Sequence, residues 1–157
     1  MQKNTKLVYV NKKIFHNYDV IDTYQAGIVL KGSEVKSIRE GNIDIRDAYC
    51  VIKRNEVWLI NSKIAPYSKS SHVKLPIDRE RKLLLHKDEI KKIIGKISQK
   101  GLSLLPTKIY FNERNYVKVE IALCKYKKIY DRREEIKRKE LKRELEAYKK
   151  HNYQQWK

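Results

Sequence analysis

The sequence changes its hydrophobic pattern near Lys125, and this change limits how the chain can fold more than any other feature. The last stretch, "YKKIYDRREEIKRKELKRELEAYKKHNYQQWK", is rich in good helix formers and contains neither Gly nor Pro. A helix that packs on its own protein needs an apolar stripe, yet only Leu141, Leu145 and Tyr148 keep helical spacing here. We therefore predict a folded domain over residues 1–124 and a basic, helix-forming tail over residues 125–157 that packs on something other than this chain.

The first 124 residues contain several segments with the alternation and β-branched content of strands. "DAYCVIK" and "EVWLINSKI" flank Arg54 and Asn55, and "PTKIYF" and "YVKVEIALC" flank "NERN", which predicts two hairpins. In the last of these strands Lys118 and Glu120 fall on the face opposite to the apolar residues Val117, Val119, Ile121 and Leu123. The stretch "IFHNYDVIDTYQAGIVL" predicts one further long strand.

Two helices are predicted between these strands. "HKDEIKKIIGKISQKG" has isoleucines at helical spacing and Gly101 as its stop signal, and "GSEVKSIREG" is a short helix bounded by Gly32 and Gly41. Strands interrupted by isolated helices indicate an α+β, mainly β fold. We expect a closed barrel similar to the oligonucleotide-binding barrel, with a few short helices.

The charge balance indicates a polyanionic partner. The chain has 37 Lys and Arg against 19 Asp and Glu, a net charge of +18, of which +7 lies in residues 125–157 and +11 in the rest. An excess of this size on both parts favours nucleic acid. A membrane partner is disfavoured, because the sequence has neither a long apolar run nor a broad apolar helix face.

No motif for catalysis or metal binding is found in the sequence. The four histidines are scattered, and Cys50 and Cys124 stand alone, which suits a reducing cytoplasm. A nuclease that binds Mg²⁺ through Asp19, Asp22, Asp44 and Asp47 remains an alternative, although isolated Asp residues more often serve turns and helix caps. We expect neither a metal site nor a cofactor.

Aromatic and basic side chains alternate in the first fifty residues or so. The rings are Tyr9, Phe15, His16, Tyr18, Tyr24 and Tyr49, among the cations Lys12, Lys13, Lys36 and Arg39. Rings stack on unpaired bases while Lys and Arg hold phosphates, although some of these rings are expected in the core instead. The pattern is typical of RNA binding.

Six blocks of the sequence, in this order and spacing, resemble the SsrA-binding protein (small protein B) family of bacterial trans-translation. They are "NKKIFHNY", "AGIVLKGSEVKSIREGN", "DAYCVI", "RERKLLLHKDEI", "KVEIALCKYKK" and "YDRREEIKRKE". The resemblance covers roughly Leu7 to Lys150, and "GSEVKSIREG" and "RKLLLHKDEI" are its most specific parts.

The resemblance implies an RNA-binding adaptor that is neither an enzyme nor dependent on a cofactor. Such a protein binds the tRNA-like domain of transfer-messenger RNA (tmRNA, or SsrA RNA), which elongation factor Tu with GTP delivers in aminoacylated form to stalled ribosomes. The tail would be disordered in the free protein and become helical, from about Asp131 to about Tyr148, in the decoding centre and the empty mRNA channel. We further expect a cytoplasmic monomer that rescues ribosomes and allows incomplete proteins to be tagged.

The resemblance also assigns contact residues. For tmRNA they are Asn11, Gln25 and Leu84, with the neighbouring positions Lys12, Lys13, His16, Gly27, Glu34, Lys36, Ser37, Arg39, Arg79, Arg81 and Lys82. For the ribosome they are the tail residues Lys125, Lys127, Lys128, Tyr130, Asp131, Arg132, Arg133, Lys137 and Arg138, among which Tyr130 would stack on a base.

The chain departs from the family pattern at two of the positions that matter here. Gln25 stands where the family usually has Glu, and Tyr126 stands where it usually has Gly. From the resemblance alone, Gln25→Glu should be tolerated or should tighten RNA binding. A general ribosome-associated or initiation-factor-like barrel would carry a similar charge and fold, and it remains the second alternative.

Overall fold

The computed structural model describes residues 5–69, 75–127 and 129–155. Contacts between residues group the chain into two compact units, Met1–Tyr126 and Lys127–Lys157. The first unit ends with strand β9 (Val117–Tyr126), which continues past the domain boundary that we placed after Cys124. The first unit is mainly β with a few short helices, as the sequence predicts.

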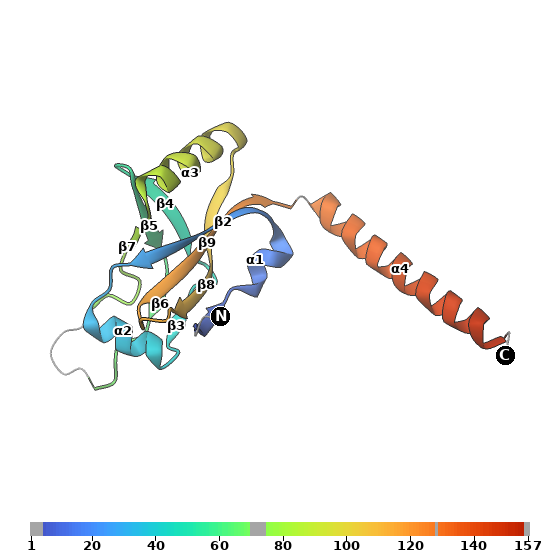
Figure 1. Cartoon of the computed structure of the whole chain (residues 1–157), viewed down its shortest axis with the longest axis horizontal. Coiled ribbons are helices and arrows are strands. Elements are labelled where there is room, and N and C mark those ends of the chain that lie inside the picture. The colour runs from blue at the N-terminus through green and yellow to red at the C-terminus, as the bar shows by residue number, and fades with distance from the viewer. Residues whose placement is uncertain (1–4, 70–74, 128, 156–157) are drawn as a thin grey trace. The chain divides into compact units, whose positions relative to one another are not determined.

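Most strands of the first unit belong to one antiparallel sheet. They are β1 (Lys6–Val10), β2 (Tyr18–Ile28), β4 (Tyr49–Lys53), β5 (Glu56–Ile60), β7 (Arg81–Leu84), β8 (Ser103–Phe111) and β9. Their order across the seven-stranded sheet is β1-β8-β9-β2-β7-β5-β4 (Figure 1). The short strands β3 (Ile43–Asp44) and β6 (Lys63–Ile64) pair with each other in a second sheet.

Both predicted hairpins are confirmed. β4 and β5 are joined by Arg54 and Asn55, whose φ angles of 51° and 61° are the left-handed values that a tight hairpin turn requires. The loop between β8 and β9 has Asn115 at a φ of 63°, and the Asn112 side chain accepts a hydrogen bond from the backbone N–H of Tyr116 (2.9 Å). The turn chemistry therefore fixes the register of both hairpins.

The sheet curls but does not close, which differs from the closed barrel that we expected. In the part of the chain that the structure describes, the edge strands β1 and β4 do not pair with each other, and β4 lies against β8 instead. The outer edge of β8 is already occupied, because β1 pairs along it and the backbone N–H of Asn11 donates to the carbonyl oxygen of Thr107 (2.8 Å). The backbone groups that would close a barrel at this edge are therefore taken.

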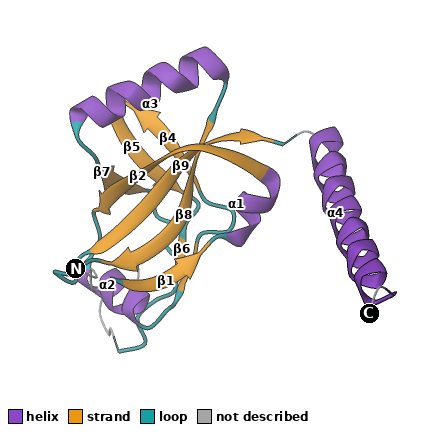
Figure 2. Cartoon of the chain, turned by 45° about the vertical axis from the view of Figure 1, so that its right-hand side comes forward, coloured by secondary structure: helices purple, strands orange, loops and turns teal. Residues whose placement is uncertain are grey.

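The two predicted helices are confirmed, and they lie at opposite ends of the curled sheet (Figure 2). They are α2 (Gly32–Arg39) and α3 (Lys87–Lys100). At the start of α3, the Glu89 carboxylate accepts a hydrogen bond from the backbone N–H of His86 (3.2 Å), and Gly101 ends the helix at a φ of 59°. Ile38 of α2 and Ile93 of α3 are fully buried and anchor the helices to the core.

The predicted long strand is wrong at its start. The structure has a helix there, α1 (Lys12–Asn17), and β2 begins at Tyr18. Ile14 of α1 is buried in a small cluster with Leu105, Ala122 and Cys124, on the sheet face away from the main core. Packing at this second cluster outweighs the local strand propensity of the β-branched and aromatic residues.

The main core fills the other face of the sheet. Alternate residues of β8 and β9 contribute to it together with residues of α2, α3, β4 and β5, among them Ile38, Val57, Leu59, Ile93, Leu104, Ile109, Val119, Ile121 and Leu123. Both cysteines are buried free thiols, Cys50 in this core and Cys124 in the cluster below α1.

The second unit consists of one long helix, α4 (Ile129–Gln155). It includes the whole stretch that we predicted to be helical on the ribosome. Its apolar side chains Ile136, Leu141, Leu145 and Tyr148 are all more than half exposed. Near its start the Lys127 ammonium donates to Glu135 (3.0 Å), which lowers the pKa of that carboxyl. Among the described helices, none is both long and apolar enough to cross a membrane.

A buried ion cluster attaches α2 to β7. The fully buried Arg81 guanidinium donates to the Glu34 carboxylate from Nε (2.9 Å) and from Nη2 (2.6 Å), and Arg79 pairs with the same carboxylate. The remaining N–H groups of Arg81 reach the Ser62 hydroxyl (2.8 Å) and the backbone carbonyl oxygens of Ser62, Arg79 and Ile77. Each nitrogen of this guanidinium thus has an acceptor, as a buried charge requires.

Glu34→Gln is expected to lower the free energy of unfolding by about 3–5 kcal/mol, because Arg81 is left buried without its counter-charge. Burial raises the pKa of Glu34, but hydrogen bonds from Arg79, the Lys31 backbone and Arg81 outweigh it and leave the pKa below its usual value of 4.5. The stabilisation is therefore complete above that value and is lost as the pH falls through the lower, folded pKa. In urea unfolding, the difference in free energy of unfolding between wild type and Glu34→Gln should be constant near neutral pH and should become smaller in acid.

The control for this experiment is Glu40→Gln, at the exposed end of the same helix, which should change the free energy of unfolding by no more than about 0.5 kcal/mol. A loss for Glu34→Gln that stays the same size in acid would contradict the assigned ion pair.

Candidate RNA-binding surface

One row of side chains crosses five strands on the outer face of the sheet, opposite the main core. Cross-strand pairing places Leu7 beside Tyr110 and Tyr110 beside Lys118. The same row continues because Lys118 pairs with Gly27, and Gly27 pairs with Leu84. Directly paired residues share a face, so these five residues form a continuous surface, here termed the outer row.

The outer row is exposed at its two ends, half-buried between them, and partly apolar. Leu7 and Leu84 have 56% and 51% of their surface exposed, and the nearby Tyr116 has 64%. A shallow groove of about 250 Å³ passes along Gly27, Leu84, Lys118 and Tyr116. Gly27 keeps this groove open, because a Cβ atom there would lie 3.3 Å from the Cβ of Leu84. Apolar and aromatic surface beside a lysine suits the ribose and base faces of RNA.

Gln25 lies beside the outer row, directly across from Glu120. Its Nε2 donates to Glu120 Oε1 (3.1 Å), and its Oε1 accepts from the Tyr110 hydroxyl (2.6 Å). Thr107 Oγ1 donates to the second oxygen of Glu120 (2.6 Å), and Lys108 Nζ lies 3.8 Å from that oxygen. Burial raises the pKa of Tyr110, and the negative charge of Glu120 raises it further. Gln25, Thr107, Tyr110 and Glu120 are here termed the polar network.

Of the contact residues that the resemblance assigns, Gln25, Gly27 and Leu84 lie on or beside the outer row, whereas their neighbours were not predicted. Leu7, Tyr110, Tyr116 and Lys118 complete the outer row and its groove, and Glu120 holds Gln25. The alternation in "YVKVEIALC" already put Lys118 on the outer face, so pairing the two strands of that hairpin would have found Tyr110 as well. The pairing with β1, β2 and β7 spans long sequence separations and leaves no local signal.

Several of the predicted basic residues are exposed on or near α2. Lys36 Nζ lies 5.5 Å from the centre of the Tyr67 ring, and the Arg39 guanidinium lies 5.5 Å from that of Phe111. Lys82 of β7 pairs with Glu56 (3.2 Å). The two ring contacts hold the side chains while leaving their charges in solvent, where phosphates can reach them.

A second group of predicted residues surrounds α1. Lys12, Lys13 and His16 are exposed, and Lys13 lines a cavity of about 420 Å³ beside the helix. Tyr18 and Tyr126 line the same cavity, with their rings 5.3 Å apart and nearly perpendicular. The expected mixture of rings and cations is therefore found here. Tyr126 contributes one of the two paired rings, at the position where the resemblance leads us to expect Gly.

Asn11 is buried, and the structure leaves it no direct contact with a ligand. Only 1% of its surface is exposed. Its Nδ2 donates to the carbonyl oxygens of Ile45 (3.2 Å) and Arg46 (3.4 Å), while its backbone N–H binds Thr107. Asn11 therefore connects the start of α1 to the segment before β4 and to β8. It can act on RNA only by positioning α1.

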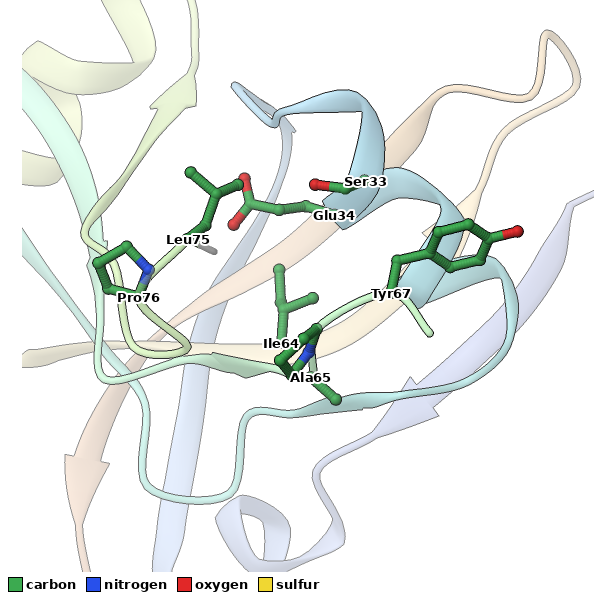
Figure 3. Close-up of a pocket in the computed structure, with 8 residues that line it drawn as sticks. Ser33, Glu34, Ile64, Ala65, Tyr67, Leu75 and Pro76 are labelled. Atoms are coloured by element: carbon green, nitrogen blue, oxygen red, sulfur yellow. The ribbon is translucent and has the colours of Figure 1, made fainter. Parts of the chain in front are cut away.

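Glu34, Ser37 and Arg81 are also buried. The Ser37 hydroxyl donates to the carbonyl oxygen of Ala65 (2.6 Å), and Glu34 belongs to the ion cluster. In Figure 3 the Glu34 carboxylate points toward Leu75 and Pro76, beside a cavity of about 20 Å³ that has room for about one water molecule. These three residues hold α2 in place, while Arg79 of the same group stays partly exposed.

The predicted tail residues differ in their surroundings. Lys125 is exposed at the end of β9, and Arg133, Lys137 and Arg138 are exposed on α4. Lys127 pairs with Glu135. Tyr130, Asp131 and Arg132 lie in the first turns of α4, and Lys128 lies outside the described residues.

The four aspartates of the nuclease alternative do not form a metal site. Asp44 accepts hydrogen bonds from Arg46 (3.0 Å) and Tyr9 (3.3 Å), and Asp22 pairs with Lys96. Over residues 5–69, 75–127 and 129–155, no group of three or more His, Cys, Asp or Glu side chains is placed to hold a metal ion. The arrangement gives the nuclease hypothesis no support.

All the known proteins that we compare with this chain belong to one family. The family model described as SmpB protein matches residues 8–151. The SsrA-binding protein of Pseudothermotoga lettingae is 51% identical over 93% of this chain and 98% of the relative. That of Persephonella marina is 52% identical over 89% of this chain and 91% of the relative. A chain of the solved structure "tmRNA-SmpB: a journey to the center of the bacterial ribosome" is 48% identical, with a TM-score of 0.65 over 78% of this chain and 85% of that chain.

Asn11→Ala is expected to lower the free energy of unfolding by about 1–3 kcal/mol, because the carbonyl oxygens of Ile45 and Arg46 lose a buried donor. His16→Ala, at an exposed position of the same helix, is the matched control and should stay within about 0.5 kcal/mol of wild type. Thermal unfolding of the two variants side by side measures this. Equal stability of Asn11→Ala and wild type would show that Asn11 is not the connection described here.

Proposed function

The chain belongs to the SmpB family, and we propose that it is an RNA-binding adaptor of trans-translation. It binds the tRNA-like domain of tmRNA and promotes the delivery of this RNA to stalled ribosomes. The observation that carries this conclusion is the family match over residues 8–151, which includes the seven-stranded sheet except the first two residues of β1, and most of the basic tail.

The outer row and the polar network are the best candidates for contact with the tRNA-like domain. Leu7, Leu84 and Tyr116 offer apolar and aromatic surface to ribose rings and unpaired bases, while Lys118 neutralises a phosphate. Exposed lysines and arginines around α1 and α2 extend this surface with positive charge: Lys12, Lys13, Lys36 and Arg39. Asn11, Glu34, Ser37 and Arg81 support the surface from below as positioning residues.

We propose that the tail occupies the decoding centre and the empty mRNA channel of the stalled ribosome. The described side chains of α4 are exposed all around the helix, so the helix is suited to a channel lined with RNA on every side. In water such a helix is marginal, because each i,i+4 ion pair gives only about 0.2–0.5 kcal/mol and nucleation is unfavourable. Phosphates around Lys137 and Arg138 would make the ordered form favourable. An intact message would fill the same space and exclude the tail.

The remaining features follow from this role. The protein acts as a monomer in the cytoplasm, catalyses no reaction and needs no cofactor. It meets elongation factor Tu with GTP indirectly, through the aminoacylated tmRNA. A general ribosome-associated or initiation-factor-like barrel is the second candidate, since the fold and charge of the first unit suit it too. The two candidates differ in their preference between tRNA-like RNA and ordinary tRNA.

A side-by-side titration with the tRNA-like domain of tmRNA and with ordinary tRNA, at one fixed salt concentration, tests the proposed function. Wild type should bind the tRNA-like domain more tightly by at least about tenfold. Leu84→Asp should remove most of that difference without changing the unfolding temperature, because Leu84 is half exposed. Ile77→Asp, which is exposed to a similar extent but lies off the outer row, is the matched control. Equal affinity of wild type for both RNAs would favour the general ribosome-binding candidate.

The role of the tail is tested separately from RNA binding by the first unit. Prolines at Lys137 and Leu141 break α4 and should leave binding to the tRNA-like domain within about twofold of wild type, while tagging of stalled chains falls to background. Alanines at the same two positions keep the helix and should retain more activity than the proline pair. In wild type, amide hydrogen exchange of residues 131–148 should be fast in the free protein. It should become slow on ribosomes stalled without downstream message. Full tagging by the proline variant would contradict a helical tail.

A further inference from the structure

The polar network fixes which way round the Gln25 amide lies. Gln25 is exposed on the outer face, and its Nε2 faces the Glu120 carboxylate while its Oε1 faces the Tyr110 hydroxyl. Rotating the amide by half a turn would place its oxygen against Glu120 Oε1. A carboxylate at neutral pH accepts hydrogen bonds and donates none, so that arrangement sets two acceptors against each other. The observed orientation is therefore imposed by Glu120.

Glu120 is itself held in place from two further directions. Its second oxygen accepts from Thr107 Oγ1 (2.6 Å) and lies 3.8 Å from Lys108 Nζ, and only 16% of its side chain is exposed. Glu120 is therefore largely covered, whereas Gln25 reaches solvent. Of the two N–H bonds of the Gln25 amide, one is used on Glu120, and the second has no acceptor among the described residues.

From this geometry we infer that Gln25 presents a hydrogen-bond donor to RNA, and that Glu120 is the positioning residue that sets this polarity. The site therefore recognises an acceptor on the RNA, either a phosphate oxygen or a base carbonyl, beside the apolar outer row. The inference rests on the proposed function, because it assumes that this face contacts the tRNA-like domain. It assigns the surface a polarity opposite to the one a glutamate at position 25 would give.

The same geometry reverses the expectation drawn from resemblance alone. Gln25→Glu would replace the donor that faces Glu120 by a second carboxylate at a separation of about 3 Å, and like charges directly opposite in a sheet are unfavourable. It would also turn the outward donor into an acceptor. Gln25→Glu should therefore lower both the free energy of unfolding and the affinity for RNA.

An exchange of the two side chains separates these effects. The double variant Gln25→Glu with Glu120→Gln keeps the net charge and composition of wild type. Glu at position 25 then accepts from Tyr110 and from the new amide at position 120, so the internal hydrogen bonds are restored. The outward group at position 25, however, is now a carboxylate. The exchange variant should unfold close to the wild-type temperature, because it loses only the long and partly exposed ion pair with Lys108. It should bind the tRNA-like domain about tenfold more weakly or worse.

Binding by the exchange variant at wild-type affinity would overturn the inference. A second measurement does not depend on any variant: the side-chain amide of Gln25 in ¹⁵N-labelled wild type should change its NMR shift when the tRNA-like domain is added. An unchanged shift at saturation would also overturn it. If the proposed function itself is wrong, the outcome is different: wild type shows no preference for the tRNA-like domain over ordinary tRNA.

The two sources of the acceptor are distinguished with the same proteins. A phosphate acceptor predicts that the exchange variant loses affinity for ordinary tRNA by a factor similar to its loss for the tRNA-like domain. A base carbonyl predicts a loss confined to the tRNA-like domain.

Discussion

The register between β2 and β9 is the constraint on which the rest of the surface depends. β2 joins the two halves of the sheet, because it pairs with β9 from Tyr18 to Gly27 and with β7 only through Gly27 and Ile28. A slip of one residue would turn Gln25 and Gly27 into the core and bring the fully buried Ala26 to the surface. The outer row and the polar network exist together because the burial of Ala26 fixes this alignment.

The residues of the most specific family motif mainly hold the fold together. In "GSEVKSIREG", Glu34, Ser37 and Ile38 are buried, and the first two bind partners more than twenty residues away in the sequence. The exposed charges near these buried residues are Lys36, Arg39 and Glu40. A motif of this kind specifies how a helix is attached to a sheet. Contact with a partner then depends on the less distinctive residues that the attachment brings to the surface.

Local features of the sequence account for much of the fold but for little of the surface. The hairpin at Arg54 and Asn55 and the end of α3 at Gly101 follow from turn chemistry, which acts over a few residues, and both were predicted. The helix α1 was missed because Ile14 owes its position to a cluster formed with β8 and β9. The open edge of the sheet and the pairing of Gln25 with Glu120 have the same cause: both depend on contacts between residues about a hundred positions apart.

The uninterrupted length of α4 has a consequence of its own. A helix of 27 residues extends about 40 Å. Under the proposed function, its full entry requires about that length of channel to be free of message. Each residue removed shortens its reach by about 1.5 Å. Because a message passes the decoding centre before it enters the channel, one that ends partway along would fill the near part of the channel and obstruct the start of α4. The length of clear channel that full entry of the tail requires is thus set by the number of helical residues rather than by any particular contact.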